Sequence, residues 1–377
     1  MRTKLCYLAL ILIPVAVYSP LLLQTFGTPE DLARLTGAGD GAAHGILYGG
    51  LVDITFNLVG HVGAVAFVRG LSVLFLVLTA LALWQLCERG GWGEWDALAV
   101  SLSVVLLPSS QLAVGWATNW PGLLAALLSI AGFAAAESEL EPAGARRVVG
   151  MLGGVLLYFA AAMCYLPNAL MALVPLAALT LARPLRLASE LGKWFRWHAL
   201  LMLVGIIGAW LVERWMMSDA GIADRSGLAE RLISLGTFSV PAGWAVFLVG
   251  ETGPMRIVCA VMALAVLATI VCGARYHTSQ DARGQTSWLL ALLGPLALFV
   301  LVAIFAPHWK DGYHTLWPLA GVVVVALAAT VRGVGDRTGK KPLWHFAALG
   351  GMTAVAVFAA VAQMQRYLGV PLRNEWQ

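Results

Sequence analysis

The sequence predicts an all-α membrane protein, a polytopic bundle of about ten or eleven transmembrane helices. Of its 377 residues, 60% are hydrophobic and only 12% are charged, whereas a soluble domain carries roughly 25% charged residues. Apolar stretches of spanning length recur along the whole chain, and a lipid environment is where so apolar a surface is stable. Basic residues concentrate in alternate connecting segments, as in proteins that cross a membrane repeatedly.

The apolar stretches define the expected spans. They occupy residues 5–25, 64–86, 97–117, 120–136, 148–166, 169–183, 198–217, 254–274, 286–306, 315–331 and 343–365. Residues 237–250 are too few to span and contain a proline, which predicts an interfacial or re-entrant segment. Within 51–63, Asp53, Asn57 and His61 recur every fourth residue, which predicts one polar face of an interfacial helix. We expect a single transmembrane domain over residues 1–377, without a separate soluble domain.

The distribution of positive charge predicts the orientation. An N-terminus in the cytoplasm places most of the 24 Lys and Arg residues inside, and an odd number of spans then places the C-terminus outside. The inside connections are short, whereas the outside segments are longer and more polar. These outside segments are residues 26–63, 107–121, 165–168, 213–253 and 307–314.

The first outside segment supplies three candidate catalytic carboxylates, Asp31, Glu30 and Asp40. A carboxylate at the membrane surface can deprotonate an acceptor hydroxyl or help to hold a divalent cation, so a divalent cation is the one cofactor to consider. A simpler interpretation exists for each residue. The sequence Thr28-Pro29-Glu30-Asp31 is a good helix start, and Asp40 lies in a glycine-rich stretch typical of a turn.

Further candidates lie in the later outside segments. Arg69, at the head of the second span, could anchor its helix or meet a lipid phosphate. Trp116 and Trp120 could stack on a sugar ring or belong to the aromatic belt. The turn at 307–314 packs together residues that suit a phosphate and a lipid head group, namely His308, Lys310, Asp311, Tyr313 and His314.

At the level of motifs, the chain resembles integral-membrane glycosyltransferases of the GT-C superfamily, especially the branch of bacterial O-antigen glucosyltransferases. The resemblance covers nearly the whole length. The matching segments are PEDLARL with the later GDG, FVRGLSVLFL, LLPSSQLAVGWATNWPGLLAALL, CYLPNALMALVPLA, DGYHTLWPLAGVVV and QRYLGVPLRNEW. Two positions depart from the family pattern: Glu30-Asp31 stands where relatives often have Asp-Asp, and His314 stands where they tend to have arginine.

This resemblance implies transfer of a hexosyl or pentosyl group from a polyprenyl-phosphate-linked donor to a surface glycan or glycolipid on the periplasmic face of a bacterial inner membrane. Asp31 would be the base, with Glu30 or Asp40 as the next candidates. The implied donor-phosphate residues are Lys310, His314, Arg69 and Arg231. The implied sugar or acceptor residues are Trp116, Trp120, Tyr165, His308 and Tyr313.

Two other functions stay open. A transporter or flippase for a lipid or polar solute should have ionisable residues deep in its helices and two similar halves; such residues are scarce, and no internal repeat is evident. A GT-C-like assembly partner that has lost its catalytic activity would agree with the departure at His314. Nucleic acid is not an expected partner, because no basic run accompanies the small positive net charge.

Overall fold

A computed structural model gives the fold of the chain. It describes residues 2–23, 29–36, 46–138, 145–182, 188–216, 228–245, 253–278, 282–305, 313–337 and 347–362. Every regular element within these ranges is a helix, and no strand occurs in them, so the predicted all-α class is confirmed.

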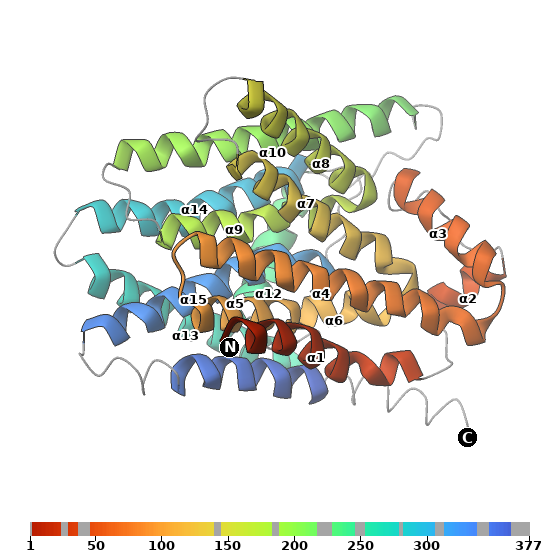
Figure 1. Ribbon diagram of the computed structural model, residues 1–377, viewed down its shortest axis with the longest axis horizontal. Coiled ribbons are helices and arrows are strands. Elements are labelled where there is room, and N and C mark those ends of the chain that lie inside the picture. Colours follow the sequence, from red (N-terminus) through yellow and green to blue (C-terminus); the bar gives the residue numbers. More distant parts are fainter. Residues whose placement is uncertain are drawn as a thin grey trace.

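The helices pack side by side as a bundle (Figure 1). The α-helices are α1 (Arg2–Leu23), α2 (Pro29–Leu35), α3 (Ile46–Val59), α4 (Val65–Arg89), α5 (Glu94–Val105), α6 (Pro108–Gly115), α7 (Trp120–Ser138), α8 (Ala145–Ala169), α9 (Leu173–Ala182), α10 (Ala188–Met216), α11 (Leu228–Ser234), α12 (Val240–Trp244), α13 (Gly253–Thr278), α14 (Ala282–Phe305) and α15 (Trp317–Arg337). Short 3-10 or π turns join some of them, namely η2 (Val62–Ala64), η3 (Ala117–Asn119), η4 (Leu170–Ala172), η5 (Leu235–Ser239) and η6 (Tyr313–Leu316). An apolar helix follows α15 at Ala347–Ala362.

Within the described residues, the predicted spans coincide with helices, apart from the break in 97–117. Among the described residues, five helices are long and apolar enough to cross a membrane, and a sixth span results if the bent pair α5 and α6 counts as one. Shorter apolar helices occupy the remaining predicted stretches near the C-terminal half, at Ile257–Cys272, Leu290–Ile304, Trp317–Gly333 and Ala347–Ala362. The chain is a multi-pass membrane protein with a helical core.

The stretch 97–117, expected to be one span, is broken into two helices. Pro108 begins α6, which is bent by 51° from α5, because proline cannot continue a helix without loss of a backbone hydrogen bond. Three successive carbonyl oxygens freed at the break, those of Val104, Val105 and Leu106, accept side-chain hydrogen bonds, and the next carbonyl, that of Leu107, accepts the backbone N–H groups of Ser110 and Gln111 as well as a side chain. The bonds run from Trp317 to Val104, from Tyr18 and Ser110 to Val105, from Gln111 to Leu106, and from Ser110 to Leu107. This satisfies polar backbone that could not otherwise be stable within a bilayer.

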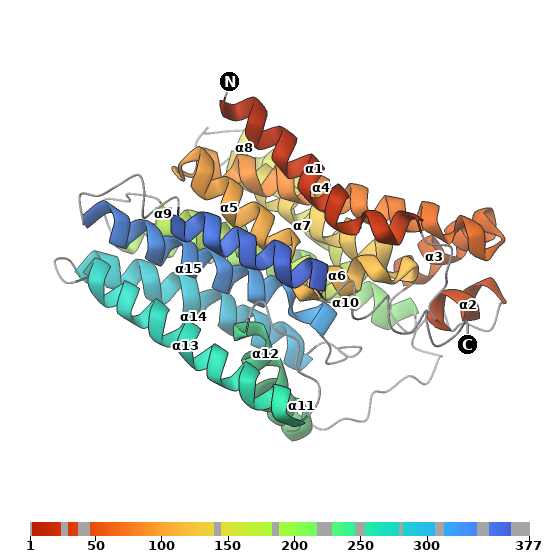
Figure 2. The same cartoon turned by 90° about the horizontal axis from the view of Figure 1, so that it is seen from below.

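The two ends of the bundle are well separated. At one end the hydroxyl of Thr3 donates to Glu94, and the Arg332 guanidinium donates to the carbonyl of Gly91. At the other end α2 and α3 lie beyond the end of α1 and beside the start of α4 (Figures 1 and 2). We call the end that carries α2 and α3 the outer end.

The chain reverses direction between α8 and α9, as the sequence CYLPNA predicted. Tyr165 is extended (φ −167°, ψ 105°) and interrupts the helix two residues before Pro167. Asn168 bonds to Gly122 at the start of α7, whereas Leu179 of α9 lies against Gly90 at the far end of α4. The outer turn between these two spans is therefore tight.

One predicted polar face is wrong. Helix α3 ends at Val59, and Gly60 adopts a positive φ of 65°, a conformation that glycine tolerates best. His61 therefore precedes η2 and does not share a helical face with Asp53 and Asn57. The segment 237–250, expected to be interfacial or re-entrant, forms the end of η5 and then the five-residue α12; residues 246–250 lie outside the described part.

Candidate functional site

The segments predicted to lie outside the membrane meet at the outer end. Asp31 of α2 bonds to Thr118, and Asn168 bonds to Gly122. The late turn η6 packs against α6. Arg231 of α11 donates to the carbonyl of Ile304, near the C-terminal end of α14. The fold therefore gathers elements from all five of these segments at one end, and which side of the membrane this end faces stays a prediction.

Asp31 and Arg69 form the polar centre of this end. The guanidinium Nη2 of Arg69 lies 3.2 Å from Oδ2 of Asp31, and both side chains are fully buried. The other carboxylate oxygen, Oδ1, accepts the backbone N–H of Thr118 at 3.2 Å. Arg69 Nε also donates to the carbonyl of Gly115 at 3.3 Å. The pair thus links α2, α4 and the connection between α6 and α7.

Local sequence explains how the two side chains reach one another. Helix α2 starts at Pro29, as expected, since proline at the first helical position loses no internal hydrogen bond. Asp31 points toward η3, and its carboxylate bonds there. Arg69 lies in the second turn of α4, where a buried guanidinium requires an anionic or carbonyl partner. In this structure Arg69 contacts Asp31 and Gly115, and the anchoring and phosphate-binding roles considered for it stay predictions.

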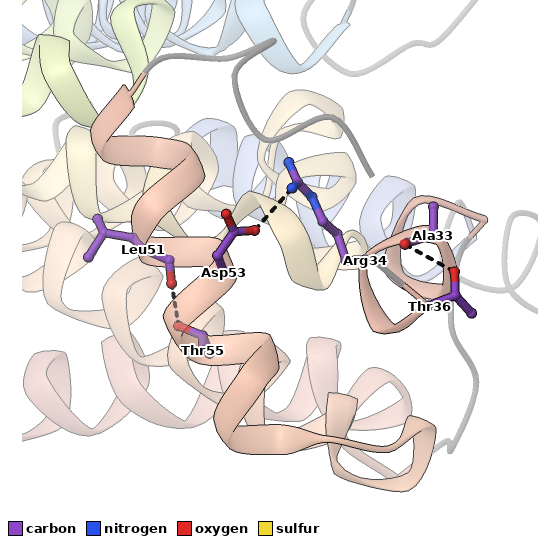
Figure 3. A network of polar contacts seen from close by, with 6 residues as sticks. All are labelled: Ala33, Arg34, Thr36, Leu51, Asp53 and Thr55. Atoms are coloured by element: carbon purple, nitrogen blue, oxygen red, sulfur yellow. Dashed lines mark hydrogen bonds and ion pairs between the residues drawn. The ribbon is translucent and has the colours of Figure 1, made fainter. Parts of the chain in front are cut away.

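A second ion pair joins α2 to α3. Arg34 Nη1 lies 3.0 Å from Oδ1 of Asp53 (Figure 3). Asp53 is exposed, so water screens this pair far more than it screens the buried one. The close-up also shows Thr36 and Thr55 bonding to backbone carbonyls of their own helices, at Ala33 and Leu51.

Aromatic side chains line the same end. The ring of Trp120 is buried and stacks on Phe75, with centroids 6.0 Å apart, so one indole face is already covered. Tyr165 is buried, with its ring 5.9 Å from that of Tyr48 in α3. Trp116 is half-buried at the C-terminal end of α6. The sugar-binding roles expected of Trp116, Trp120 and Tyr165 are not tested by these contacts.

Two buried amides were not recognised in the sequence. Asn168 donates to the carbonyl of Gly122 at 2.9 Å, and the side chain of Asn119 approaches the same glycine. A Cβ at position 122 would lie 2.7 Å from Oδ1 of Asn119 and 3.3 Å from the Tyr165 ring. The signal available in the sequence was Asn-Trp-Pro-Gly at 119–122, a helix start with a capping residue and an adjacent glycine.

The remaining candidates fall partly or wholly outside the described residues. Asp40, His308 and Lys310 lie outside them entirely. The backbones of Glu30, Tyr313 and His314 are described, in α2 and η6, but their side chains are not. Their catalytic, phosphate-binding and sugar-binding roles stay predictions. Arg231 is half-buried and donates to the carbonyl of Ile304, one residue before α14 ends.

The described carboxylates do not fit a divalent cation. Asp31 already faces the positive charge of Arg69, and Asp53 faces that of Arg34, whereas hard cations need several oxygen ligands without a competing positive group. No cluster of three His, Cys, Asp or Glu side chains that could hold a metal occurs in the described ranges. The divalent cation considered from the sequence stays a prediction, because the side chain of Glu30 and all of Asp40 lie outside the described part of the chain.

Comparison with solved structures supports this fold independently. The chain is similar to the oligosaccharyltransferase of Archaeoglobus fulgidus, crystallised with zinc and sulfate, at a TM-score of 0.50 and 12% identity. The match covers 94% of this chain and 53% of that one, so the chain spans about half the length of the oligosaccharyltransferase. The fold is thus GT-C-like, as the motifs implied; the O-antigen branch stays a prediction.

A lower similarity is found to ArnT from Cupriavidus metallidurans bound to undecaprenyl phosphate. Its TM-score is 0.38 at 13% identity, over 87% of this chain and 78% of that one. The sequence matches no model of a known protein family and none of the curated proteins.

Proposed function

We propose that this protein is a membrane glycosyltransferase that moves a hexosyl or pentosyl group from a polyprenyl-phosphate-linked donor to an acceptor hydroxyl. The observation that carries the proposal is the buried carboxylate of Asp31 beside the Arg69 guanidinium, 3.2 Å away, at the outer end of the bundle. The shared fold with an oligosaccharyltransferase, over 94% of this chain, supports the same class of reaction.

The chemistry requires two functions from the site. A base must take the proton of the acceptor hydroxyl as the oxygen attacks the sugar carbon, and positive charge must stabilise the phosphate that leaves. Asp31 supplies a carboxylate, and each of its oxygens has more than one lone pair with which to accept a proton or a hydrogen bond. Arg69 supplies a planar guanidinium suited to phosphate.

The proposed acceptor is a surface glycan or glycolipid, and the proposed location is a bacterial inner membrane with the outer end in the periplasm. The aromatic side chains of Trp116, Trp120 and Tyr165, with His308 and Tyr313 of the late turn, are the proposed sugar contacts. Lys310, His314 and Arg231 are proposed to act with Arg69 on the donor phosphate, since α11 and η6 lie at the same end.

Turnover by the purified protein tests this function. The full chain is supplied with polyprenyl-phosphate sugars and a glycan acceptor, and release of the lipid phosphate is followed. We expect Asp31→Asn to reduce the rate by at least about a hundredfold, as for loss of a general base. The matched control Asp53→Asn removes an exposed carboxylate from the same outer segment and should retain the rate.

Two results would contradict the proposal. One is equal turnover by the Asp31→Asn variant and the wild type. The other is no turnover with any donor together with movement of the sugar lipid between leaflets of reconstituted vesicles, which would favour the flippase considered from the sequence.

A further inference from the structure

The carboxylate of Asp31 sits in a group of donors that would suit any small anion. Arg69 provides a fully buried guanidinium, and Thr118 provides a backbone N–H; each approaches a different carboxylate oxygen at 3.2 Å. Guanidinium and backbone N–H groups are the donors that bind phosphate oxygens in proteins. The guanidinium and N–H come from α4 and from η3, whereas the anion comes from α2.

Within the described part of the chain, helix α2 has few neighbours apart from this contact. It has seven residues, and helices of this length are marginal without tertiary support. Its main neighbours are α3 and η3, and Leu32 is exposed. The link to α3 through Arg34 and Asp53 has an exposed carboxylate and a mostly buried guanidinium, and water screens it far more than the fully buried pair. Local opening of such an element requires less free energy than unfolding of the bundle.

We propose that Arg69 and the Thr118 N–H form an anion-binding site that Asp31 occupies in the resting protein and that the phosphate of a lipid-linked donor occupies when α2 withdraws. The identity of the ligand rests on the function proposed above, whereas the site itself rests on the geometry. Exchange of one anion for another keeps the buried guanidinium neutralised throughout, which avoids the large free-energy cost of an unpaired charge. The same exchange frees the Asp31 carboxylate for the acceptor hydroxyl.

Binding of phosphate probes to the full-length protein tests this site. Farnesyl phosphate, inorganic phosphate and farnesol are titrated into wild type, Asp31→Asn, Arg69→Gln and Asp53→Asn. The Asp31→Asn change removes the competing anion, so farnesyl phosphate should bind at least about tenfold more tightly, the factor expected from one charge-assisted hydrogen bond. Arg69→Gln should abolish binding. Asp53→Asn removes the same charge from the adjacent helix and should leave binding unchanged.

The other probes distinguish the source of the phosphate. Farnesol has no phosphate and should bind all variants alike. If Asp31→Asn binds both inorganic phosphate and farnesyl phosphate more tightly than the wild type does, the head group alone is recognised. If only farnesyl phosphate binds more tightly, the site needs a lipid-anchored phosphate. Equal or weaker binding of farnesyl phosphate by Asp31→Asn would overturn the proposal.

A hydrogen-exchange measurement on the wild type tests the same site without relying on variants that could fail to fold. Amide hydrogen exchange of residues 29–36 is recorded with and without farnesyl phosphate. Displacement of Asp31 should make exchange in α2 faster, the opposite of the protection that a ligand usually gives; slower or unchanged exchange contradicts the site. Tighter binding of farnesyl phosphate by Asp31→Asn, together with no turnover of any sugar donor by the wild type, would retain the anion site and reject the transferase.

Discussion

Gly205 of α10 packs directly on the backbone of α8 at Val155. A Cβ at position 205 would lie 2.8 Å from the carbonyl oxygen of Val155 and 2.9 Å from the backbone nitrogen of Phe159. Small residues permit close approach of transmembrane helices, where contact area stabilises the pair. This contact fixes α10 against the span that leads to the Tyr165 turn.

Gly205→Ala should therefore destabilise the fold. Backbone atoms cannot rotate away, so α10 must shift, and we expect a loss of about 1–3 kcal/mol. Gly208→Ala on the same helix is the matched control, because its Cβ would meet the Phe159 ring at an ordinary 3.4 Å. Thermal unfolding in detergent should separate the two variants; equal midpoints would show that the helices do not pack this closely.

Trp317 should contribute to stability through its N–H. The indole Nε1 donates to the Val104 carbonyl at 2.8 Å, in the break between α5 and α6. Trp317→Phe keeps an aromatic ring but leaves a buried carbonyl without this donor, which costs about 1–3 kcal/mol. Trp215→Phe, at an exposed position of α10, should have little effect in the same unfolding assay. A Trp317→Phe variant as stable as wild type would mean that another group satisfies Val104.

The two ion pairs of the outer segment should differ in strength. Arg69→Gln leaves the buried Asp31 carboxylate without its cation and should destabilise the protein by about 3–5 kcal/mol. Arg34→Gln breaks the pair whose carboxylate, that of Asp53, is exposed, and should cost less than about 1 kcal/mol because water solvates the carboxylate left behind. A double-mutant cycle with Asp31→Asn measures the buried pair directly. Similar losses for the two arginine variants would contradict the burial of Asp31.

Glu137 holds α7 to α10 at the end opposite α2. Its Oε2 accepts from Trp194 Nε1 and pairs with His198 Nε2, each at 2.9 Å. Glu137→Leu removes both hydrogen bonds and should cost about 1–3 kcal/mol for each donor left unsatisfied. Glu190→Leu, at an exposed position in the first turn of α10, should cost less than about 1 kcal/mol. Equal unfolding midpoints for the two variants would exclude this contact.

The spans were predictable from the sequence because a helix that crosses a bilayer must be apolar over its whole length, and hydropathy measures that property directly. The reversal at Pro167 was predictable for the same reason, since two apolar stretches flank a turn sequence. The assignment of 97–117 as a single span did not include the bend at Pro108, although the proline itself marked a helix end. The bend depends on side chains such as Trp317, Tyr18 and Gln111, which reach the freed carbonyls from three helices. Gly60, whose positive φ separates His61 from α3, shows that a spacing of four predicts a shared face only while the helix continues.

For the candidate site, the sequence determined that Asp31 follows a helix-starting proline and that Arg69 stands at the head of a span, since capping and hydropathy are local properties. The sequence left two possible roles for each residue: Asp31 as a base or as part of a helix start, and Arg69 as a helix anchor or as a phosphate ligand. Only the tertiary structure decided that the two side chains, 38 residues apart, form a buried ion pair completed by the N–H of Thr118. That outcome depends on how α2 folds back over α4 and η3, and the desolvation that makes the pair strong arises only when those elements pack together.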